Sequence, residues 1–371
     1  MIRLSKSCLS DTEKQAVMGV LDRGFLGMGT EVQQFEDALT KFFGRPAVCV
    51  STGTAALHLA FQVAGIGTGD EVLIQSLTYV ASFQAISATG AKPIVCDVNP
   101  ETFCLDIKDA EDRLTPRTKA VVPVHYAGGV GALNDIYAFA EKHGLRVIED
   151  AAHAFGSRYK DKRIGSFGDV ACFSFDGIKN ITSGEGGCIV TDDQVLLDKA
   201  RDARLLGVEK DTDNRFLGKR SWDFDVTAQG WRYHMSNIMA AIGLEQLKRF
   251  PELSAKRKSL AKLFDTQLSN VPGIELFSHN YDNVTPHIYV IKLQSGLNRE
   301  KIREKLEQCG VQTGIHYKPN HHLSLYQDAS KNLHETDEIY PRILSLPLHP
   351  DLSKKEIKYV CEKLIEAISG S

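Results

Sequence analysis

Short β-rich runs alternate with helical stretches over residues 47–148, and this alternation is the feature that most limits the possible folds. The runs are Ala47 to Val50, Glu71 to Ile74, Pro93 to Val98, Ala120 to Val124 and Arg146 to Ile148. Strands separated by helices are typical of βαβ units, which form parallel sheets with helices on both faces. The sequence therefore predicts an α/β fold with a mostly parallel central sheet flanked by helices.

The chain changes character after Pro251. The elements predicted there are a long charged helix, a strand at 287–293, a helix at 299–309 and a last helix at 354–368. A chain of 371 residues with 43% hydrophobic residues is long enough to build two cores. We therefore expect a large domain over residues 1–248 and a smaller α+β domain over residues 249–371.

Composition and charge limit the partners. Charged residues make up 25% of the chain and the formal net charge is −3, which indicates neither a nucleic-acid footprint nor an acidic tail. The eight cysteines are scattered without a C-x-x-C pair, which favours reduced, buried thiols. The N-terminus lacks the apolar region of a signal peptide, and no later stretch is apolar enough for a bilayer. We expect a cytoplasmic protein without nucleic-acid or membrane partners.

Residues 51–57, Ser-Thr-Gly-Thr-Ala-Ala-Leu, follow a β-rich run and open a predicted helix. The free N–H groups and the dipole of such a helix start favour a phosphate group. The same residues also suit an ordinary Ser/Thr N-cap with a glycine for the turn. Taken alone, this segment leaves both interpretations open.

Two acidic residues, Glu149 and Asp150, follow the β-rich run that begins at Arg146. Ligands bind at the carboxyl ends of strands in open α/β sheets, so one carboxylate is expected to face a site. Because side chains alternate along a strand, the other carboxylate must point away. A polar strand end near solvent is the alternative interpretation.

Lys179 lies between two further β-rich runs, 170–175 and 187–191, in a segment that contains Gly177 and Gly184. This connection is too short and too rich in glycine for an ordinary crossover helix, which indicates a functional loop. A lysine that is desolvated there has a lowered pKa and becomes a usable amine nucleophile. Without further context, a solvated surface lysine would be the more common case.

Several segments, in order along the chain, resemble the DegT/DnrJ/EryC1/StrS family of sugar aminotransferases. This family has the aspartate-aminotransferase-like type I fold of enzymes that depend on pyridoxal 5′-phosphate (PLP). The resemblance covers nearly the whole chain. The matching segments are 25–29 with Val32 and Phe35-Glu36, 51–57, 69–72, 78–81, 149–153, the Lys179 loop, 233–237, 240–243 and 345–349.

The resemblance implies catalytic roles for two residues. Lys179 would carry PLP as a Schiff base and move a proton between the cofactor and the substrate carbon. Asp150 would pair with the pyridine nitrogen and keep it protonated, so that the ring acts as an electron sink. Relatives that dehydrate sugars have histidine at the lysine position, so Lys179 favours transamination.

The resemblance also implies further cofactor contacts. The phosphate would be held by Gly53, Thr54, Ala55 and Ser174. Tyr79 would stack on the ring face, and His153, where relatives often carry glutamine, would lie near the ring hydroxyl. Asn237, at the start of a helix predicted over 236–247, matches a family residue that reaches the phosphate in the neighbouring subunit. A homodimer with shared active sites is therefore expected.

Two segments are candidates for substrate binding. Residues 209–224, with Arg220 among several basic residues, suit either a mobile loop that offers positive charge to a sugar diphosphate or a solvated loop. His316 and Tyr317 lie where the family carries substrate-binding residues, although they would also suit a domain interface. No acidic or cysteine partner accompanies the histidines of 316–322 at a recognised spacing, so we expect no metal.

The sequence therefore predicts a PLP-dependent aminotransferase that moves an amino group from an amino acid, expected to be L-glutamate, to a keto-sugar. The expected acceptor is a nucleotide-linked 4-keto-6-deoxyhexose of cell-surface polysaccharide, lipopolysaccharide or O-antigen, biosynthesis. A 3-keto nucleotide sugar or an unactivated acidic sugar, such as an oxidised 3-deoxy-octulosonate, stays open because nothing in the sequence identifies the base or the sugar position. A non-catalytic regulatory homologue would have lost Lys179 or Asp150, and both are present.

Overall fold

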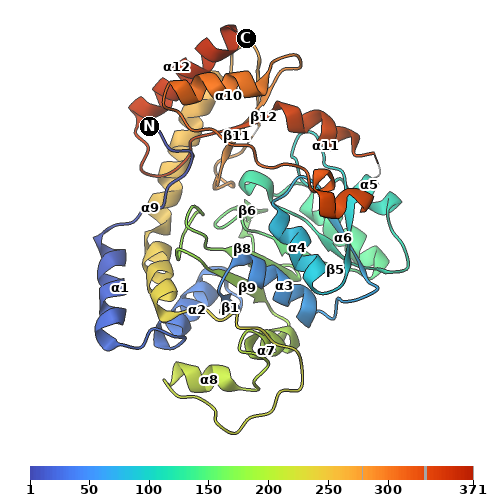
Figure 1. The fold of residues 1–371 in the computed structure, drawn as a ribbon, viewed down its shortest axis with the longest axis vertical. Helices are drawn as coiled ribbons and strands as arrows, with labels where there is room; N and C mark the ends of the chain where they lie inside the picture. Colours follow the sequence, from blue (N-terminus) through green and yellow to red (C-terminus); the bar gives the residue numbers. More distant parts are fainter. Residues whose placement is uncertain (278, 330–331, 371) are drawn as a thin grey trace.

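The computed structural model describes residues 1–277, 279–329 and 332–370, and its centre is a seven-stranded sheet (Figure 1). The strand order is β1-β9-β8-β5-β4-β2-β3. The strands are β1 (Ala47–Val50), β2 (Glu71–Gln75), β3 (Lys92–Cys96), β4 (Thr118–Val122), β5 (Arg146–Asp150), β8 (Val170–Ser174) and β9 (Gly187–Thr191). β9 is antiparallel to both neighbours, and the other neighbouring strands are parallel. The predicted α/β fold with a mostly parallel sheet is confirmed.

Helices cover both faces of this sheet. They are α2 (Thr30–Phe43), α3 (Gly53–Val63), α4 (Val80–Ala88), α5 (Ile107–Asp112), α6 (Leu133–His143) and α7 (Gln194–Ala203). Val50 packs in one core with α3 and α4, whereas its neighbour Cys49 packs in another core with α2. Because successive side chains of each strand are buried on opposite faces, the strands are continuous apolar runs.

Helix α1 (Asp11–Arg23) begins with a capping box. The Ser10 hydroxyl caps the helix, and the Glu13 carboxylate accepts a hydrogen bond from the Ser10 N–H at 2.7 Å. Gly24 ends the helix with a φ of 70°, a left-handed conformation that glycine adopts without strain. In Figure 1, α1 lies alongside the lower half of α9 (Asn237–Leu268).

Helix α9 corrects one expectation. The sequence predicted a helix over 236–247 and a separate charged helix after Pro251, but the structure has one helix that passes through the proline. Proline inside a helix costs about 3 kcal/mol, because it removes a hydrogen bond and crowds the preceding turn. The buried side chains of Phe250 and Leu253 hold the helix in its packing across this point. The boundary that we propose between domains 1–248 and 249–371 therefore falls within a continuous helix.

The second part of the molecule is built around a three-stranded sheet. Its strands are β10 (Ile274–Leu276), β11 (Tyr289–Leu293) and β12 (Ile343–Leu346), and both pairings are antiparallel. The later turns of α9 pack on it together with α10 (Arg299–Gln308) and α12 (Lys354–Ser369) around a separate apolar core. The N-terminus joins this part through a bridge between Ile2 and Val311 (Figure 1).

Short elements connect these layers. They are β6 (Arg158–Tyr159), β7 (Lys162–Arg163), α8 (Asp211–Phe216), α11 (His334–Ile339) and the 3₁₀ turns η1 (Tyr126–Gly128), η2 (Asn320–His322), η3 (Ser324–Ala329) and η4 (Tyr340–Arg342). α8 and the segment that follows it project at the bottom of Figure 1. η2 and α11 bring three polar side chains together, those of His321, His322 and Asp337.

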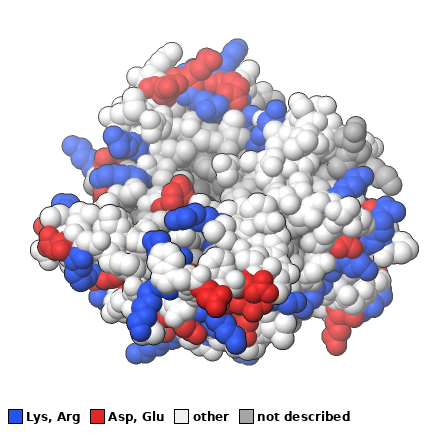
Figure 2. Space-filling view, turned by 60° about the horizontal axis from the view of Figure 1, so that its bottom comes forward, with Lys and Arg blue, Asp and Glu red and all other residues white. Residues whose placement is uncertain are grey.

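The cysteines are free thiols, and one of them corrects the expectation of burial. Cys309 is exposed because it caps the C-terminal end of α10 at the surface. Figure 2 shows a face of the molecule on which basic and acidic side chains are interspersed. Among the described residues, no helix combines the length and the apolar character that crossing a membrane requires.

Candidate active site

A cavity of about 540 Å³ opens at the carboxyl ends of β5 and β8. Parallel α/β sheets bind ligands at this edge, because loops and helix starts meet there. The predicted site residues that line the cavity are Gly53, Thr54, Tyr79, Asp150, His153, Ser174, Lys179, His316 and Tyr317. The fold thus brings together side chains that are widely separated in the sequence.

Asp150 and Glu149 point to opposite sides of β5, as the alternation of side chains requires. Asp150 lines the cavity, and its two oxygens accept hydrogen bonds from Ser82 Oγ at 2.6 Å and from the Ala152 N–H at 3.1 Å. Glu149 is fully buried on the other side, where its carboxylate lies 2.6 Å from His125 Nε2 and accepts a bond from Tyr137 at 2.5 Å. Hydrogen bonds therefore hold the Asp150 carboxylate at the cavity, whereas the Glu149 carboxylate forms hydrogen bonds inside the core.

Lys179 lies in the loop between β8 and β9. Its main-chain N–H donates to the Asp176 carbonyl at 3.1 Å, so the loop turns back on itself before the lysine. Burial lowers the pKa of the amine to about 8, against the opposing effect of Asp150 and Asp176. At neutral pH the group therefore has a substantial neutral fraction, and the neutral amine is the form that attacks an aldehyde.

The start of α3 forms another wall of the cavity. Thr52 caps the helix by accepting a bond from the Ala55 N–H at 3.0 Å. Within the described part of the chain, no hydrogen bond engages the N–H groups of Gly53 and Thr54. A Cβ at Gly53 would lie 2.7 Å from Ser174 Cβ, so only glycine allows β8 to approach the helix start this closely.

This geometry fits a phosphate group at the helix start. The two free N–H groups, the helix dipole and the Ser174 hydroxyl are suitable donors for an anion. Ala55 differs from the expectation, because it does not line the cavity and its N–H is already bonded to Thr52. The structure leaves Gly53 and Thr54 as the backbone donors.

His153 and Tyr317 form a hydrogen-bonded pair across the cavity. The Ala127 N–H donates to His153 Nδ1 at 3.3 Å, so a neutral ring carries its proton on Nε2, which lies 2.9 Å from the Tyr317 hydroxyl. Burial holds the pKa of His153 well below its usual value and raises the pKa of Tyr317. Tyr79, the N-cap residue of α4, is exposed to the cavity with its ring centroid 5.5 Å from that of Tyr317.

Sequence reasoning missed two residues behind Lys179. His287 is buried, and its Nε2 lies 3.3 Å from Lys179 Nζ. Arg257, on α9, donates to the main-chain carbonyls of Lys179 at 3.4 Å and His287 at 3.0 Å. His287 is 108 residues from Lys179 and belongs to no recognised motif, so no local signal in the sequence identifies this contact.

Besides Ala55, two predicted site residues lie outside this cavity. Asn237 begins α9, and its Nδ2 donates to the Phe25 carbonyl at 3.0 Å. It lines a separate open hollow together with Phe25 and Leu217. Asn237 Oδ1 is buried and has no hydrogen-bond partner among the described residues. Arg220 is exposed on the segment after α8 and does not line the cavity of its own chain.

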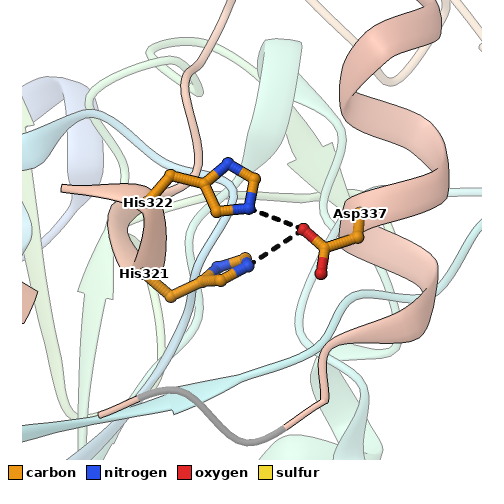
Figure 3. Close-up of side chains that lie close together, drawn as sticks. All are labelled: His321, His322 and Asp337. Carbon is orange, nitrogen blue, oxygen red and sulfur yellow. Dashed lines mark hydrogen bonds and ion pairs between the residues drawn. The ribbon is translucent and has the colours of Figure 1, made fainter. Parts of the chain in front are cut away.

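The histidines after Tyr317 have a partner that their spacing in the sequence does not indicate. The sequence offered no acidic partner at a recognised spacing, but folding brings Asp337 to both His321 and His322 (Figure 3). The partner was missed because it comes from α11, on the other side of η3. These residues do not line the cavity.

Several known proteins resemble this chain over nearly its whole length, and three of them show the similarity. The spore coat polysaccharide biosynthesis protein SpsC of Bacillus subtilis is 38% identical over 370 residues, which cover 97% of this chain and 95% of SpsC. Spr1654 of Streptococcus pneumoniae, assigned as a sugar aminotransferase and solved in PLP and PMP forms, has a TM-score of 0.93, 28% identity and full coverage of both chains for the PMP form. PseC of Helicobacter pylori, an aminotransferase of pseudoaminic acid biosynthesis, has a TM-score of 0.92 and 27% identity, again with full coverage.

These similarities confirm the fold type, the enzyme class and the PLP cofactor that the resemblance implied. The sequence model of the DegT/DnrJ/EryC1/StrS aminotransferase family matches residues 7–365. Together with the identity to SpsC, this match shows the family. The chain belongs to the DegT/DnrJ/EryC1/StrS aminotransferase family.

Proposed function

We propose that the protein transfers an amino group from L-glutamate to a nucleotide-linked 4-keto-6-deoxyhexose for a cell-surface polysaccharide. One observation carries the proposal: a lysine with a pKa of about 8 shares a cavity with a fixed carboxylate and a helix start with two free N–H groups. An aldehyde cofactor with a basic ring nitrogen and a phosphate needs these three groups. The similarity to SpsC and PseC supports a sugar acceptor.

Each predicted site residue that lines the cavity has a role in this proposal. When bound, PLP supplies an electron sink for the electron pair left on the substrate carbon. Lys179 binds the cofactor aldehyde, and as a free amine it removes and returns the proton of the substrate carbon. Asp150, held by Ser82 and the Ala152 N–H, keeps the pyridine nitrogen protonated. Gly53, Thr54 and Ser174 hold the phosphate.

The aromatic residues orient the ring and the substrate. Tyr79 is placed to stack on the ring face, and His153 donates toward the ring hydroxyl in exchange for its bond to Tyr317. His316 and Tyr317 contact the sugar, because they line the cavity from a segment that Gly314 joins to β12 rather than to the central sheet. These side chains exclude water from the reacting carbon once the substrate is bound.

The proposal includes a cytoplasmic homodimer with shared sites. Asn237 has an unpaired buried oxygen and lies beside exposed apolar side chains, among them Phe25 and Leu217. Exposed apolar groups around a hollow are typical of an interface. Since Asn237 and Arg220 do not line the cavity of their own chain, they would complete the cavity of a second copy.

A panel of substrates tests the proposal. Enzyme saturated with PLP is mixed with glutamate and, separately, with nucleotide-linked 4-keto and 3-keto sugars and an oxidised 3-deoxy-octulosonate. Mass spectrometry is expected to show the amino sugar and an equal amount of 2-oxoglutarate with the 4-keto compound. Glutamine, alanine and aspartate replace glutamate as donor controls. Amination of only the 3-keto or the acidic sugar would move the proposal to that acceptor, and no amination of any sugar would reject it.

A further inference from the structure

Three potential metal ligands meet outside the active-site cavity (Figure 3). His321 Nε2 lies 3.0 Å and His322 Nε2 lies 2.8 Å from the same oxygen, Oδ1 of Asp337. The ligand atoms of the three residues all lie within 4.8 Å of one another. The two rings come from η2 and the carboxylate from α11, so the group joins two separate elements.

The histidine side of this group is held firmly to the central sheet. The Asn320 side-chain amide donates to the carbonyls of Ser76 at 3.0 Å and Thr78 at 2.8 Å. The His321 N–H donates to Ser76 Oγ at 3.3 Å. η2 is therefore fixed against the loop after β2, which sets the backbone position from which both histidine rings extend.

The carboxylate side is held as well. Asp97 is buried at the start of α11, where its two oxygens accept bonds from the N–H groups of Glu335 at 2.9 Å and Thr336 at 2.8 Å. This pair of bonds fixes the first turn of α11, which carries Asp337. A ligand that binds to groups already held in place loses little affinity to their ordering.

The buried ring, His321, has the surroundings of a metal ligand. Its second nitrogen, Nδ1, lies 2.7 Å from Ser76 Oγ, which fixes the ring and directs Nε2 toward Asp337. Metal-bound histidines usually have such a partner on the other nitrogen. His322 and Asp337 are partly exposed and give an ion access from solvent.

We propose that His321, His322 and Asp337 bind one divalent ion of the zinc class, with water completing its coordination. Two imidazoles and one carboxylate are a common ligand set for zinc in proteins. Ligand atoms about 2 Å from a tetrahedral ion lie about 3.3 Å apart. The observed spacings of 2.8 and 3.0 Å to Oδ1 differ from this value by a few tenths of an ångström, and the two Nε2 atoms lie within 4.8 Å of each other.

Such an ion would brace one wall of the active site. It would link α11 to η2, which directly follows the segment that carries His316 and Tyr317. A second group on α11, His334 with Glu335 and Glu338, is much more exposed, since the His334 side chain is 80% accessible. This second group serves as a matched control.

Metal content and affinity test the proposal without any assay of amino transfer. The holoenzyme is prepared as Cys309→Ser, so that the exposed thiol cannot bind zinc, and is stripped with a chelator. After incubation with zinc and desalting, elemental analysis is expected to find one ion per chain. His322→Gln and Asp337→Asn should each weaken zinc binding by at least about 100-fold, and Ser76→Ala by about 10- to 100-fold. His334→Gln should leave binding unchanged.

Two results would overturn the proposal. One is zinc binding by His322→Gln and Asp337→Asn at the affinity of the parent, with the PLP absorbance showing that both variants are folded. The other is no zinc retained by the parent protein, which would leave the three side chains as a hydrogen-bonded contact between histidine and carboxylate. Either result leaves the proposed amino transfer untouched, because the measured quantity is bound metal.

Discussion

The cavity at Lys179 and the hollow at Asn237 differ in how much of each is completed by one chain. In the cavity, both oxygens of Asp150 and both nitrogens of His153 have partners. In the hollow, Asn237 Oδ1 is buried without a partner among the described residues, and Phe25 is 41% exposed. In one chain the polar groups of the cavity are therefore paired, whereas the hollow keeps an unpaired oxygen, which our proposal assigns to the site of a second chain.

The two regions also rest on different kinds of structural element. The residues of the cavity at Lys179, which we call the chemical half, lie at strand ends and at a helix start, where backbone geometry fixes the side chains. The outer region, with Asn237 and Arg220, lies at the N-terminus of α9 and on the exposed segment after α8. If the two regions form one site, changes in the first should abolish chemistry, and changes in the second should act through assembly or binding.

The largest effect is expected from Lys179→Ala. Loss of the only nucleophilic amine in the described cavity should lower turnover by about 10⁴-fold or more, because the residue acts in every step. Borohydride treatment of the wild type, followed by peptide mapping, should place the phosphopyridoxyl group on Lys179. Lys318→Ala, at an exposed lysine beside Tyr317, is the matched control and should stay active. An adduct on any other lysine would disprove the assignment.

Asp150→Asn should come next, with turnover reduced about 10³-fold while PLP stays bound. A neutral amide cannot keep the pyridine nitrogen protonated, and misplacing a proton beside a catalytic ring has effects of this size. Glu149→Gln tests the opposite face of the same strand. It should lower the free energy of unfolding by about 1 to 3 kcal/mol, through the His125 and Tyr137 bonds, and spare turnover. Equal turnover in Asp150→Asn and wild type would reject the role of Asp150.

The rate at which the Lys179 amine is alkylated at different pH values distinguishes a buried amine from a surface amine. In the cofactor-free enzyme with a pKa of about 8, about a tenth of the amine is neutral at pH 7, against about one part in 3,000 for an ordinary lysine. The group is charged below its pKa, so its reductive alkylation should rise tenfold per pH unit up to about pH 8 and then level off. Mass spectrometry of the Lys179 peptide measures this. A rate that still rises tenfold between pH 9 and 10 would contradict the lowered pKa.

Much of the chemical half was predictable because it obeys local rules. The alternation of apolar runs located the sheet, and the period of two along a strand required Glu149 and Asp150 to face opposite ways. The family resemblance then selected Asp150. Thr52, Gly53 and Thr54 were recognisable as a helix start after a strand. The contacts that were not predicted join segments that are far apart in the sequence. His287 contacts Lys179 from 108 residues away, and Asp337 contacts η2 from another helix.

The continuous helix α9 was missed for an energetic reason. Proline inside a helix destabilises it by about 3 kcal/mol, so a rule based on local sequence predicts that the helix ends at Pro251. Burial of Phe250 and Leu253 outweighs that cost, and burial depends on the whole fold. Ala55 was also mispredicted because sequence rules do not give side-chain geometry. Whether its N–H binds a phosphate or the N-cap depends on the rotamer of Thr52.

Mixed dimers test whether the two regions belong to one site. Lys179→Ala and Asn237→Asp are each expected to be inactive, the second because a carboxylate repels the phosphate and weakens PLP binding about tenfold or more. Half of the randomly mixed dimers carry one chain of each kind, and one of their two sites is intact, so about a quarter of wild-type activity should return. Lys179→Ala mixed with Asp150→Asn is the control. Both residues come from one chain's cavity, so no activity should return.

A failure of the first mixture, with subunit exchange verified, would show that Asn237 acts within its own chain. An active monomer in sedimentation would have the same meaning. If both mixtures recovered activity, exchange of whole domains would be the better account. The pair of mixtures therefore tests the assignment of Asn237 separately from the chemistry of Lys179.

Arg220→Gln should have the smallest effect. Arg220 is exposed in its own chain, and an exposed charge that meets a sugar diphosphate across an interface contributes about 1 kcal/mol or less. The KM for the nucleotide sugar should therefore rise about threefold to fivefold, with kcat unchanged, because the contact is made equally in the ground and transition states. The KM for glutamate should not change.

Lys219→Gln removes the same charge one residue earlier and serves as the matched control. An arginine binds a phosphate with two parallel N–H donors, whereas a lysine acts as a single charge. A rise in KM confined to Arg220→Gln would indicate a direct contact, and equal rises would indicate only the overall charge of the segment. No rise in either variant would return this segment to the alternative left open by the sequence, a solvated loop. In that case the outer region would contribute Asn237 to the partner's site, and the sugar would be recognised within one chain by His316 and Tyr317.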